Sequence, residues 1–162
     1  MQVKLKPALL ALALLQGSAL ALLPGAALAQ ERPWPVLERM GVVGTWSPSC
    51  GAGPSKDNPF VTYYTEKQGL VRRKVDVGGD VTANTTVDAA QQLSPTTLRM
   101  RQRLDDAKWG QQNGAVFEVV MEMVDGRTRV LSSIASDGKP AVKDGRIVAT
   151  GVVTPRNEKC GN

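Results

Sequence analysis

Residues 115–136, AVFEVVMEMVDGRTRVLSSIAS, carry the clearest structural pattern of the chain. Asp125-Gly126 separates two apolar-rich runs, and this dipeptide tolerates the positive φ that a tight hairpin turn needs. The first run alternates in polarity, as the two faces of a strand do. The stretch therefore predicts an antiparallel pair of strands with one face buried. The apolar face of the first strand holds Phe117, Val119, Met121 and Met123.

Comparable runs of Val, Thr, Tyr and Ile recur along most of the chain, separated by turn residues such as Gly78-Gly79 and Asp137-Gly138. No long amphipathic helix is expected. Pro33 and Pro35 suppress one near the start, where residues 36–40 suit a single helical turn. We expect eight strands, at residues 42–47, 61–66, 69–77, 81–93, 96–104, 115–124, 127–136 and 146–154.

Eight sequential strands joined mostly by short turns predict an all-β fold, a single eight-stranded antiparallel up-and-down barrel. Closing the sheet removes both of its exposed edges. A β-sandwich with a Greek-key crossover is the alternative, and the short links argue against the long return connection that it needs. We expect the barrel at residues 41–162, after a lead-in segment at residues 30–40.

Two polar residues interrupt the expected apolar faces. Arg73 shares a face with Val75, and Gln102 shares a face with Met100. A buried guanidinium is costly unless it is paired. Arg73 therefore meets a carboxylate inside the barrel, reaches water at a barrel mouth, or binds an anionic ligand. Gln102 is either a polar anchor in a cavity or a residue at an end where the apolar face breaks down.

A basic stripe occupies the opposite face of residues 96–104, with Arg99, Arg101 and Arg103 at every second position. The neighbouring strand presents Glu118 and Glu122 outward. Such residues form ion pairs across a ladder, each contributing about 0.2–1 kcal/mol. The alternative is a surface for an acidic partner. The two glutamates lie about 13 Å apart along a strand, which does not suit a paired acid/base site.

Residues 1–29 have the pattern of a cleavable signal peptide. Lys4 and Lys6 precede an apolar run at residues 8–23, and Ala27-Leu28-Ala29 fits signal peptidase. The alternative is a membrane anchor, which Pro24 and the shortness of the run disfavour. Cleavage after Ala29 leaves 133 of the 162 residues and lowers the net charge from +5 to +3. We expect a periplasmic or extracellular protein with no stable membrane insertion after cleavage, and a monomer.

Cys50 and Cys160 are the only cysteines, so a single intramolecular pairing exists. An oxidising compartment favours the disulfide, which would stabilise the fold by about 4–5 kcal/mol in the chain-entropy model. Free thiols or an intermolecular bridge are the alternatives. Cys50 follows the first expected strand, and Cys160 lies six residues beyond the last one. These strands are neighbours in an up-and-down barrel, so the bridge would clasp the seam and tie down residues 47–58.

The chain contains no histidine, which excludes Ser-His-Asp and Cys-His nucleophiles and the zinc motifs that use histidine. There is also no CxxC, GxGxxG or P-loop motif. We therefore expect no enzyme activity, no cofactor and no metal site. A net charge of +3 on the processed chain gives no reason to expect nucleic-acid binding.

Gly44-Thr45-Trp46 opens the first expected strand and resembles the Gly-x-Trp signature of lipocalin-like, calycin-type barrels. This resemblance implies that Trp46 plugs one end of the barrel and that a basic residue near the chain end, Arg156, packs over it. The chain departs from that family in leaving no room for a C-terminal helix. It also resembles small bacterial exported proteins with a GTW-x-x-x-C opening, for which no activity is implied.

The leading functional hypothesis is a non-enzymatic exported barrel that binds a small apolar or amphipathic ligand in its interior. Its candidate ligand contacts are Arg73, Gln102, Met121 and Met123. The alternative is a protein-interaction module, an inhibitor or accessory subunit in the cell envelope that uses residues 47–58. An enzyme using carboxylates or Tyr63 and Tyr64 is a third hypothesis, with nothing in the sequence to motivate it.

Overall fold

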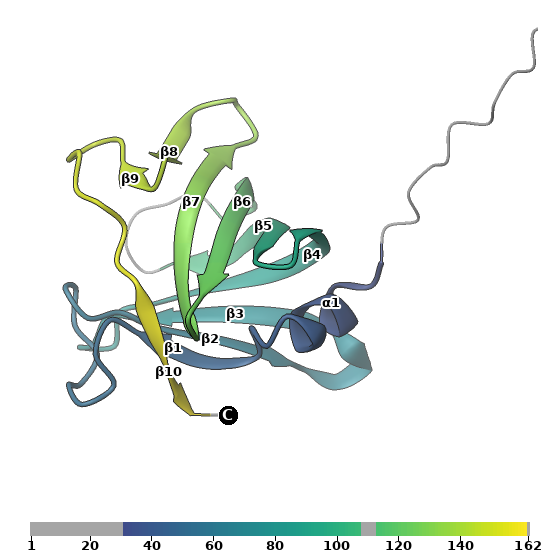
Figure 1. The fold of residues 1–162 in the computed structure, drawn as a ribbon, viewed down its shortest axis with the longest axis horizontal. Coiled ribbons are helices and arrows are strands. Elements are labelled where there is room, and N and C mark those ends of the chain that lie inside the picture. The colour runs from purple at the N-terminus through teal and green to yellow at the C-terminus, as the bar shows by residue number, and fades with distance from the viewer. Residues whose placement is uncertain (1–30, 108–112, 162) are drawn as a thin grey trace, which may run out of the picture.

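A computed structural model describes residues 31–107 and 113–161, and the predicted signal peptide lies outside the described residues. The described chain forms a closed, eight-stranded antiparallel β-barrel with one α-helix (Figure 1), which confirms the predicted architecture. Strands β10 and β1 to β7 make the ring, and β8 and β9 extend the sheet beyond β7. The strands are β1 (Gly44–Ser47), β2 (Phe60–Thr65), β3 (Val71–Asp76), β4 (Thr82–Ser94), β5 (Thr97–Ala107), β6 (Val116–Val124), β7 (Arg127–Ala135), β8 (Pro140–Lys143), β9 (Arg146–Ile147) and β10 (Asn157–Gly161).

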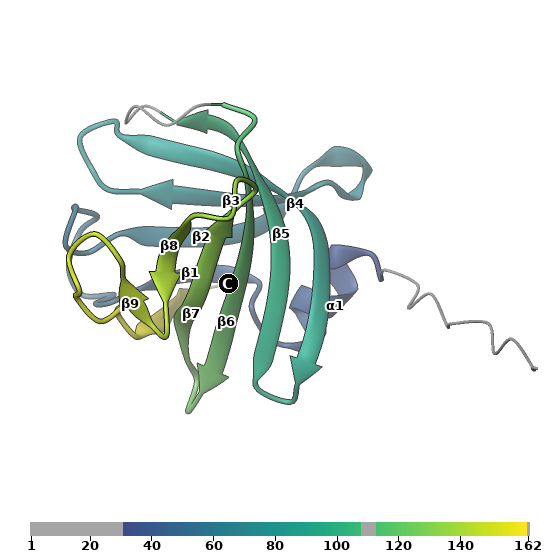
Figure 2. The ribbon, with the colours of Figure 1, turned by 90° about the horizontal axis from the view of Figure 1, so that it is seen from above.

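The long strands β4 and β5 join the two sides of the barrel. They bend so that β4 pairs with β3 and β5 pairs with β6 (Figure 2). Irregular register in the β4–β5 ladder accompanies this bend, for example between Val87 and Ala89. Such bulges increase local twist and allow a sheet to curve. A short 3₁₀ helix, η1 (Lys67–Gly69), connects β2 to β3.

The strand expected at residues 146–154 is wrong, and the strand that closes the barrel is β10. After β9 the chain reverses, because Gly151 has a φ of 69° and its N–H donates to the carbonyl of Ile147. This valine-rich run therefore folds back on itself as a hairpin instead of pairing with β1. The polar sequence of β10 gave no strand signal, and β10 pairs because two strand edges flank it.

The edge of β7 is shared by two partners. Its first residues pair with β10, through Thr128 and Asn157, and its last residues pair with β8, through Ser133 and Val142. Between them, the hydroxyl of Thr154 donates to the carbonyl of Val130 over 2.7 Å. Backbone and side-chain groups therefore satisfy this edge along its length, which closes the barrel without a continuous ladder.

Helix α1 (Pro33–Arg39) covers one end of the barrel, and it is longer than the single turn expected there. Pro33 stands at the start of the helix, where no intrahelical N–H is needed, so the proline favours this helix instead of suppressing it. Val36 and Leu37 are fully buried against the barrel core. No helix among the described residues is long and apolar enough to cross a membrane.

Apolar side chains from both ends fill the interior of the barrel. One cluster joins α1 and Trp46 to strands β2 to β6, and a smaller one joins Val75, Ala83 and Leu104. In β6, Val119 and Met121 are buried while Phe117 and Met123 pack against the core, which confirms the predicted alternation. The larger cluster consists of Val36, Leu37, Met40, Val42, Trp46, Tyr63, Val71, Val87, Ala90, Leu98, Met100, Val119 and Met121.

A disulfide joins Cys50 and Cys160, with their Cα atoms 5.1 Å apart, which confirms the predicted pairing. Cys160 lies within β10, not beyond the last strand as expected. Because β10 is the ladder neighbour of β1, the bridge does fasten the last strand to the first. It closes a loop of 110 residues between distant parts of the chain.

Replacing both cysteines by serine is expected to lower the free energy of unfolding by about 3–5 kcal/mol, because the unfolded chain gains the entropy of a long open loop. Hydrogen exchange should then accelerate first in β10 and residues 48–59, the parts that the bridge ties together. Denaturant titration and exchange mass spectrometry measure both effects. Faster exchange starting in the β4–β5 hairpin instead would contradict this assignment of the seam.

Candidate functional site

The four residues proposed as ligand contacts lie on β3, β5 and β6 and are not gathered around one hollow. Met121 is buried in the main cluster and pairs with Leu98 across the ladder, about 13 Å along β5 from Gln102. Met123 packs against the same cluster near Gly41. Neither of two large surface hollows of the described chain is lined by any of the four. Their role in ligand binding stays a prediction.

Gln102 and Arg73, the two polar residues that interrupt the apolar faces, have different surroundings. Gln102 is 3% exposed, and its Nε2 donates to the Sδ atom of Met100 over 3.7 Å, a weak interaction for a buried amide. Arg73 is half-buried opposite Tyr63 and Thr85. Within residues 31–107 and 113–161 no carboxylate forms an ion pair with Arg73, which disfavours the internal-carboxylate alternative.

Trp46 closes the α1 end of the barrel. It is 2% exposed, and its indole N–H donates to the carbonyl of Val42 over 2.7 Å. The basic residue over its ring is Lys159, with the ammonium 5.7 Å from the ring centre, and not Arg156 as expected. Lys159 is the ladder partner of Trp46 in β10, whereas Arg156 precedes that strand and is exposed. Gly44 begins β1 with a φ of 114°, which few other residues adopt.

The opposite end of the barrel carries the Asn58 loop, residues 48–59, which connects β1 to β2. The side chain of Asn58 is 9% exposed and forms the centre of this loop. Its Nδ2 donates to the carbonyls of Ser49, Ala52 and Gly53 over 3.0, 3.3 and 3.1 Å. Its Oδ1 accepts from the hydroxyl of Ser47 and the N–H of Ser49 over 2.8 and 2.9 Å. One amide therefore holds the backbone of residues 49–53 in place.

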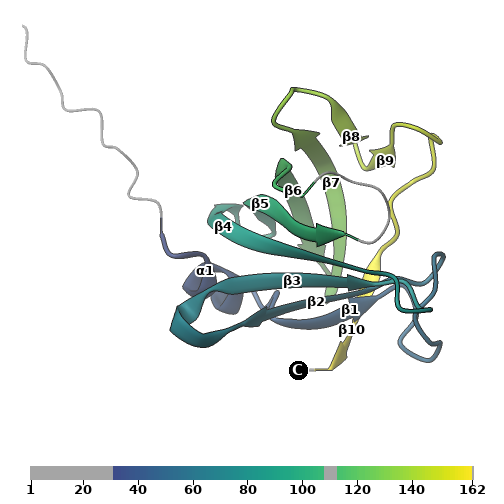
Figure 3. The same cartoon turned by 180° about the vertical axis from the view of Figure 1, so that it is seen from behind.

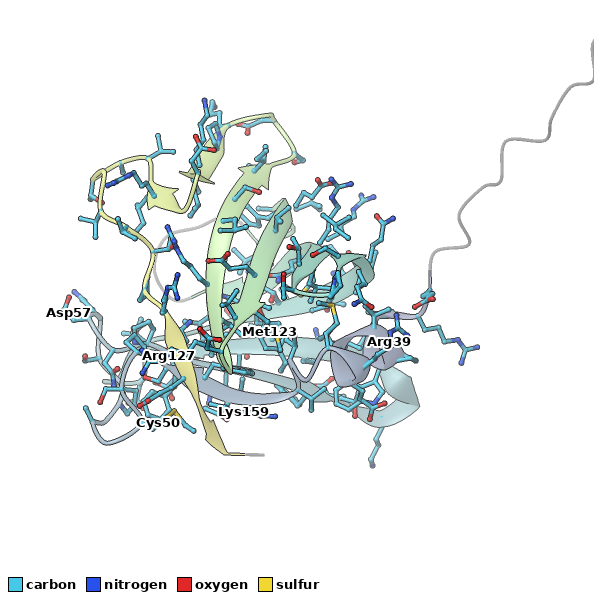
Figure 4. The ribbon with its side chains drawn as sticks, in the orientation of Figure 1. Arg39, Cys50, Asp57, Met123, Arg127 and Lys159 are labelled. Carbon is cyan, nitrogen blue, oxygen red and sulfur yellow. A yellow bond between two sulfur atoms is a disulfide. The ribbon has the colours of Figure 1, made fainter. Side chains whose placement is uncertain are left out.

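Contacts with other elements fasten the Asn58 loop to the barrel. The disulfide ties Cys50 to β10, and the backbone N–H of Cys50 also donates to Glu158 over 2.8 Å. On the other side the carbonyl of Pro54 lies so close to Gly78 that no side chain would fit there. Asp57 lies at the outer edge of the loop, and Cys50 lies beside β10 (Figure 4). Residues 51–57 are exposed, so the loop presents a held backbone to solvent.

Ion pairs outside the barrel account for much of the predicted basic stripe. Arg99 pairs with Glu118 over 3.3 Å, as expected, whereas Arg103 pairs with Asp88 and Asp105. Asp105 also accepts from Arg72 over 2.6 Å. Burial by itself would lower the pKa of Arg72, but hydrogen bonding to Glu66 and the charges of Asp105 and Glu66 raise that pKa above its ordinary value. These contacts favour the structural interpretation of the stripe.

Two hollows lie on the outer wall of the barrel. The larger, of about 780 Å³, lies between α1 and the β4–β5 hairpin, where Arg39 pairs with Glu31 over 2.9 Å. The smaller, of about 570 Å³, lies between β7 and β8 and includes Arg129 and Glu122, 3.8 Å apart. The charges that line each hollow thus largely pair with one another. No group of three metal-ligating side chains occurs in the part of the chain that the structure describes.

Neither a protein-family model, nor a curated protein, nor a solved structure matches the chain. The closed eight-stranded barrel is consistent with a lipocalin-like fold. The functional interpretation therefore depends on the geometry of the molecule. The most distinctive feature of that geometry is the Asn58 loop. In the sequence its central residue stands out only as one polar residue before Pro59.

The contact between Gly78 and Pro54 gives a test of how firmly the loop is held. Gly78 has a φ of 77°, and Gly79 beside it has a φ of 58°, but only Gly78 faces another segment. Both Gly→Ala changes incur the cost of a left-handed backbone, about 1–2 kcal/mol. We expect Gly78→Ala to destabilise the protein by at least about 1 kcal/mol more than Gly79→Ala in thermal unfolding, since it also displaces Pro54. Equal effects would mean that the loop moves aside freely.

Replacing Asn58 by alanine removes the centre of the loop and leaves several buried polar groups without partners. We expect a loss of about 2–3 kcal/mol in the free energy of unfolding and rapid hydrogen exchange throughout residues 48–59. Asn113→Ala, at an exposed turn, serves as the control and should leave both measurements unchanged. Unaltered exchange in the Asn58→Ala loop would show that the disulfide alone orders it.

Proposed function

We propose that the protein is a non-enzymatic exported binding module that recognises a protein partner in the cell envelope through the Asn58 loop. The observation that carries the proposal is the combination of exposed residues 51–57 with a buried Asn58 side chain and an anchoring disulfide. A loop already ordered before binding loses little conformational entropy on association. Recognition residues are commonly found on loops that a rigid scaffold positions.

The chemistry of the loop suits a polar interface. Lys56 and Asp57 are exposed at its outer edge, beside small residues that let another backbone approach closely. Pro48, Pro54 and Pro59 further restrict the backbone. These properties are those expected of an inhibitor or accessory subunit, which binds a preformed surface instead of transforming a substrate. The disulfide is in keeping with an exported protein, because such bridges persist in oxidising compartments.

A second candidate function is binding of a small apolar or amphipathic ligand inside the barrel. It is favoured by Gln102, a buried amide whose only hydrogen-bond acceptor among the described residues is a thioether sulfur. An amide in that position would gain from a ligand oxygen. The side chains that fill the interior weigh against this candidate, since a ligand would have to displace some of them. Native mass spectrometry of the gently purified protein detects a retained ligand directly.

Chemical cross-linking in an envelope extract tests the leading proposal. Lys56 provides an amine at the loop, so a partner bound there should give cross-links to it that competing unlabelled protein removes. The variant Lys56→Ala with Asp57→Ala should reduce recovery of that partner at least roughly tenfold, because both contacts are lost. Lys67→Ala, at the exposed η1 helix of the α1 end, is the matched control and should have no effect. Unchanged recovery of the partner with the loop variant would reject the proposal. Lysozymes can be tested individually as partners by measuring whether the protein inhibits their activity.

A further inference from the structure

The segment that separates β9 from β10 has an unusual composition. Residues 147–155, IVATGVVTP, contain no charged side chain, and Arg146 and Arg156 stand at their two ends. No carboxylate occurs between Asp144 and Glu158. An apolar run bordered by cations on both sides is therefore present within a chain that has only a small positive net charge.

These residues form a protruding hairpin, which we term the valine hairpin, residues 146–153. It lies with β8 at the end of the barrel opposite α1 (Figure 3). Val148, Val152 and Val153 are 53%, 58% and 45% exposed and are the three most exposed large apolar residues of the described chain. Isolated exposed valines are ordinary, but three on one short hairpin concentrate apolar surface on a single protrusion, and concentrated apolar surface is a feature of binding sites.

Several backbone groups of the valine hairpin are hydrogen-bonded within the hairpin itself. The N–H of Ile147 donates to the carbonyl of Val152 over 2.8 Å, and the N–H of Gly151 donates to the carbonyl of Ile147 over 2.7 Å. The guanidinium of Arg146 donates to the carbonyl of Gly151 over 3.1 Å. Hydrocarbon offers no replacement partners for polar backbone groups, so groups that are bonded within the hairpin can approach the acyl chains at lower cost.

We propose that the valine hairpin docks the protein reversibly on an anionic lipid bilayer. The valines would enter the boundary between headgroups and acyl chains, while Arg146 and Arg156 at the base of the hairpin would contact lipid phosphates. The charge arrangement selects this occupant, because cations behind an uncharged apolar tip match a negative surface over a hydrocarbon layer. Lys143 on neighbouring β8 is exposed too, but exposed Asp144 follows it, so this turn adds no net charge and the two arginines carry the electrostatic argument. The proposal is independent of the role assigned to the Asn58 loop.

Vesicle co-sedimentation tests the proposal. The protein is recovered from the exported fraction of expressing cells, and its N-terminus is determined by mass spectrometry so that no targeting segment contributes to binding. We expect sedimentation with phosphatidylglycerol-containing vesicles, weak sedimentation with phosphatidylcholine vesicles, and a decrease as salt is raised. The variant Val148→Asp with Val152→Asp should lower the bound fraction roughly tenfold, since it places charge in the apolar tip.

The matched control is Leu93→Asp with Val124→Asp, which adds the same charge at exposed apolar positions near the ends of β4 and β6 and should leave binding intact. Circular dichroism verifies that both variants fold. Equal losses in both variants would mean that net charge, not the hairpin, governs binding. Failure to bind anionic vesicles overturns the proposal. So does a lipid-free dimer that the valine variant abolishes, because the hairpin would then bind a second copy of the chain.

Discussion

The barrel depends on β10, a strand of five residues that pairs with two edges at once. Its ladders are short, with three residue pairs to β1 and two to β7, so backbone hydrogen bonds alone hold it weakly. Side chains supply the remainder: its residues anchor the Asn58 loop, cover Trp46 and form the disulfide. Glu158, Lys159 and Cys160 fill these three roles, in that order. Three of the four side chains of this polar strand thus have a structural partner, whereas the buried Oδ1 atom of Asn157 has no hydrogen-bond partner among the described residues.

Sequence-based prediction succeeded where the residues of a strand themselves encode its pairing, and it failed where neighbouring strand edges impose the pairing. The β6–β7 hairpin was predictable because alternation and Asp125-Gly126 agree on one structure. Residues 146–154 have an equally strong β composition, but that composition reflects how well a side chain suits a half-buried sheet surface. In the valine hairpin the same residues are exposed, so composition misled. β10 was missed because its pairing arises from the two edges beside it and not from its own residues.

The position of the Asn58 loop was predictable from the sequence, but the interactions that hold the loop in shape were not. The cysteines indicated that the loop after the first strand is tethered, yet the central role of Asn58 requires the folded positions of five groups that converge on it. The interior presented a related difficulty. Alternation correctly turned Met121 inward, but whether space remains depends on summed side-chain volumes. Helix α1, expected as a single turn, adds Val36 and Leu37 to that volume.

A packed interior changes how such a barrel can act. With α1 and Trp46 closing one end, the wall becomes a stiff support, and the Asn58 loop and the valine hairpin both stand at the other end (Figure 1). A stiff support fixes the distance and angle between two surfaces, which a flexible linker does not. If the hairpin rests on a bilayer, the loop faces the same bilayer, and its accessible partners are those at the membrane surface. Confinement of both molecules to that surface raises their effective concentration, so a modest interface would suffice for binding.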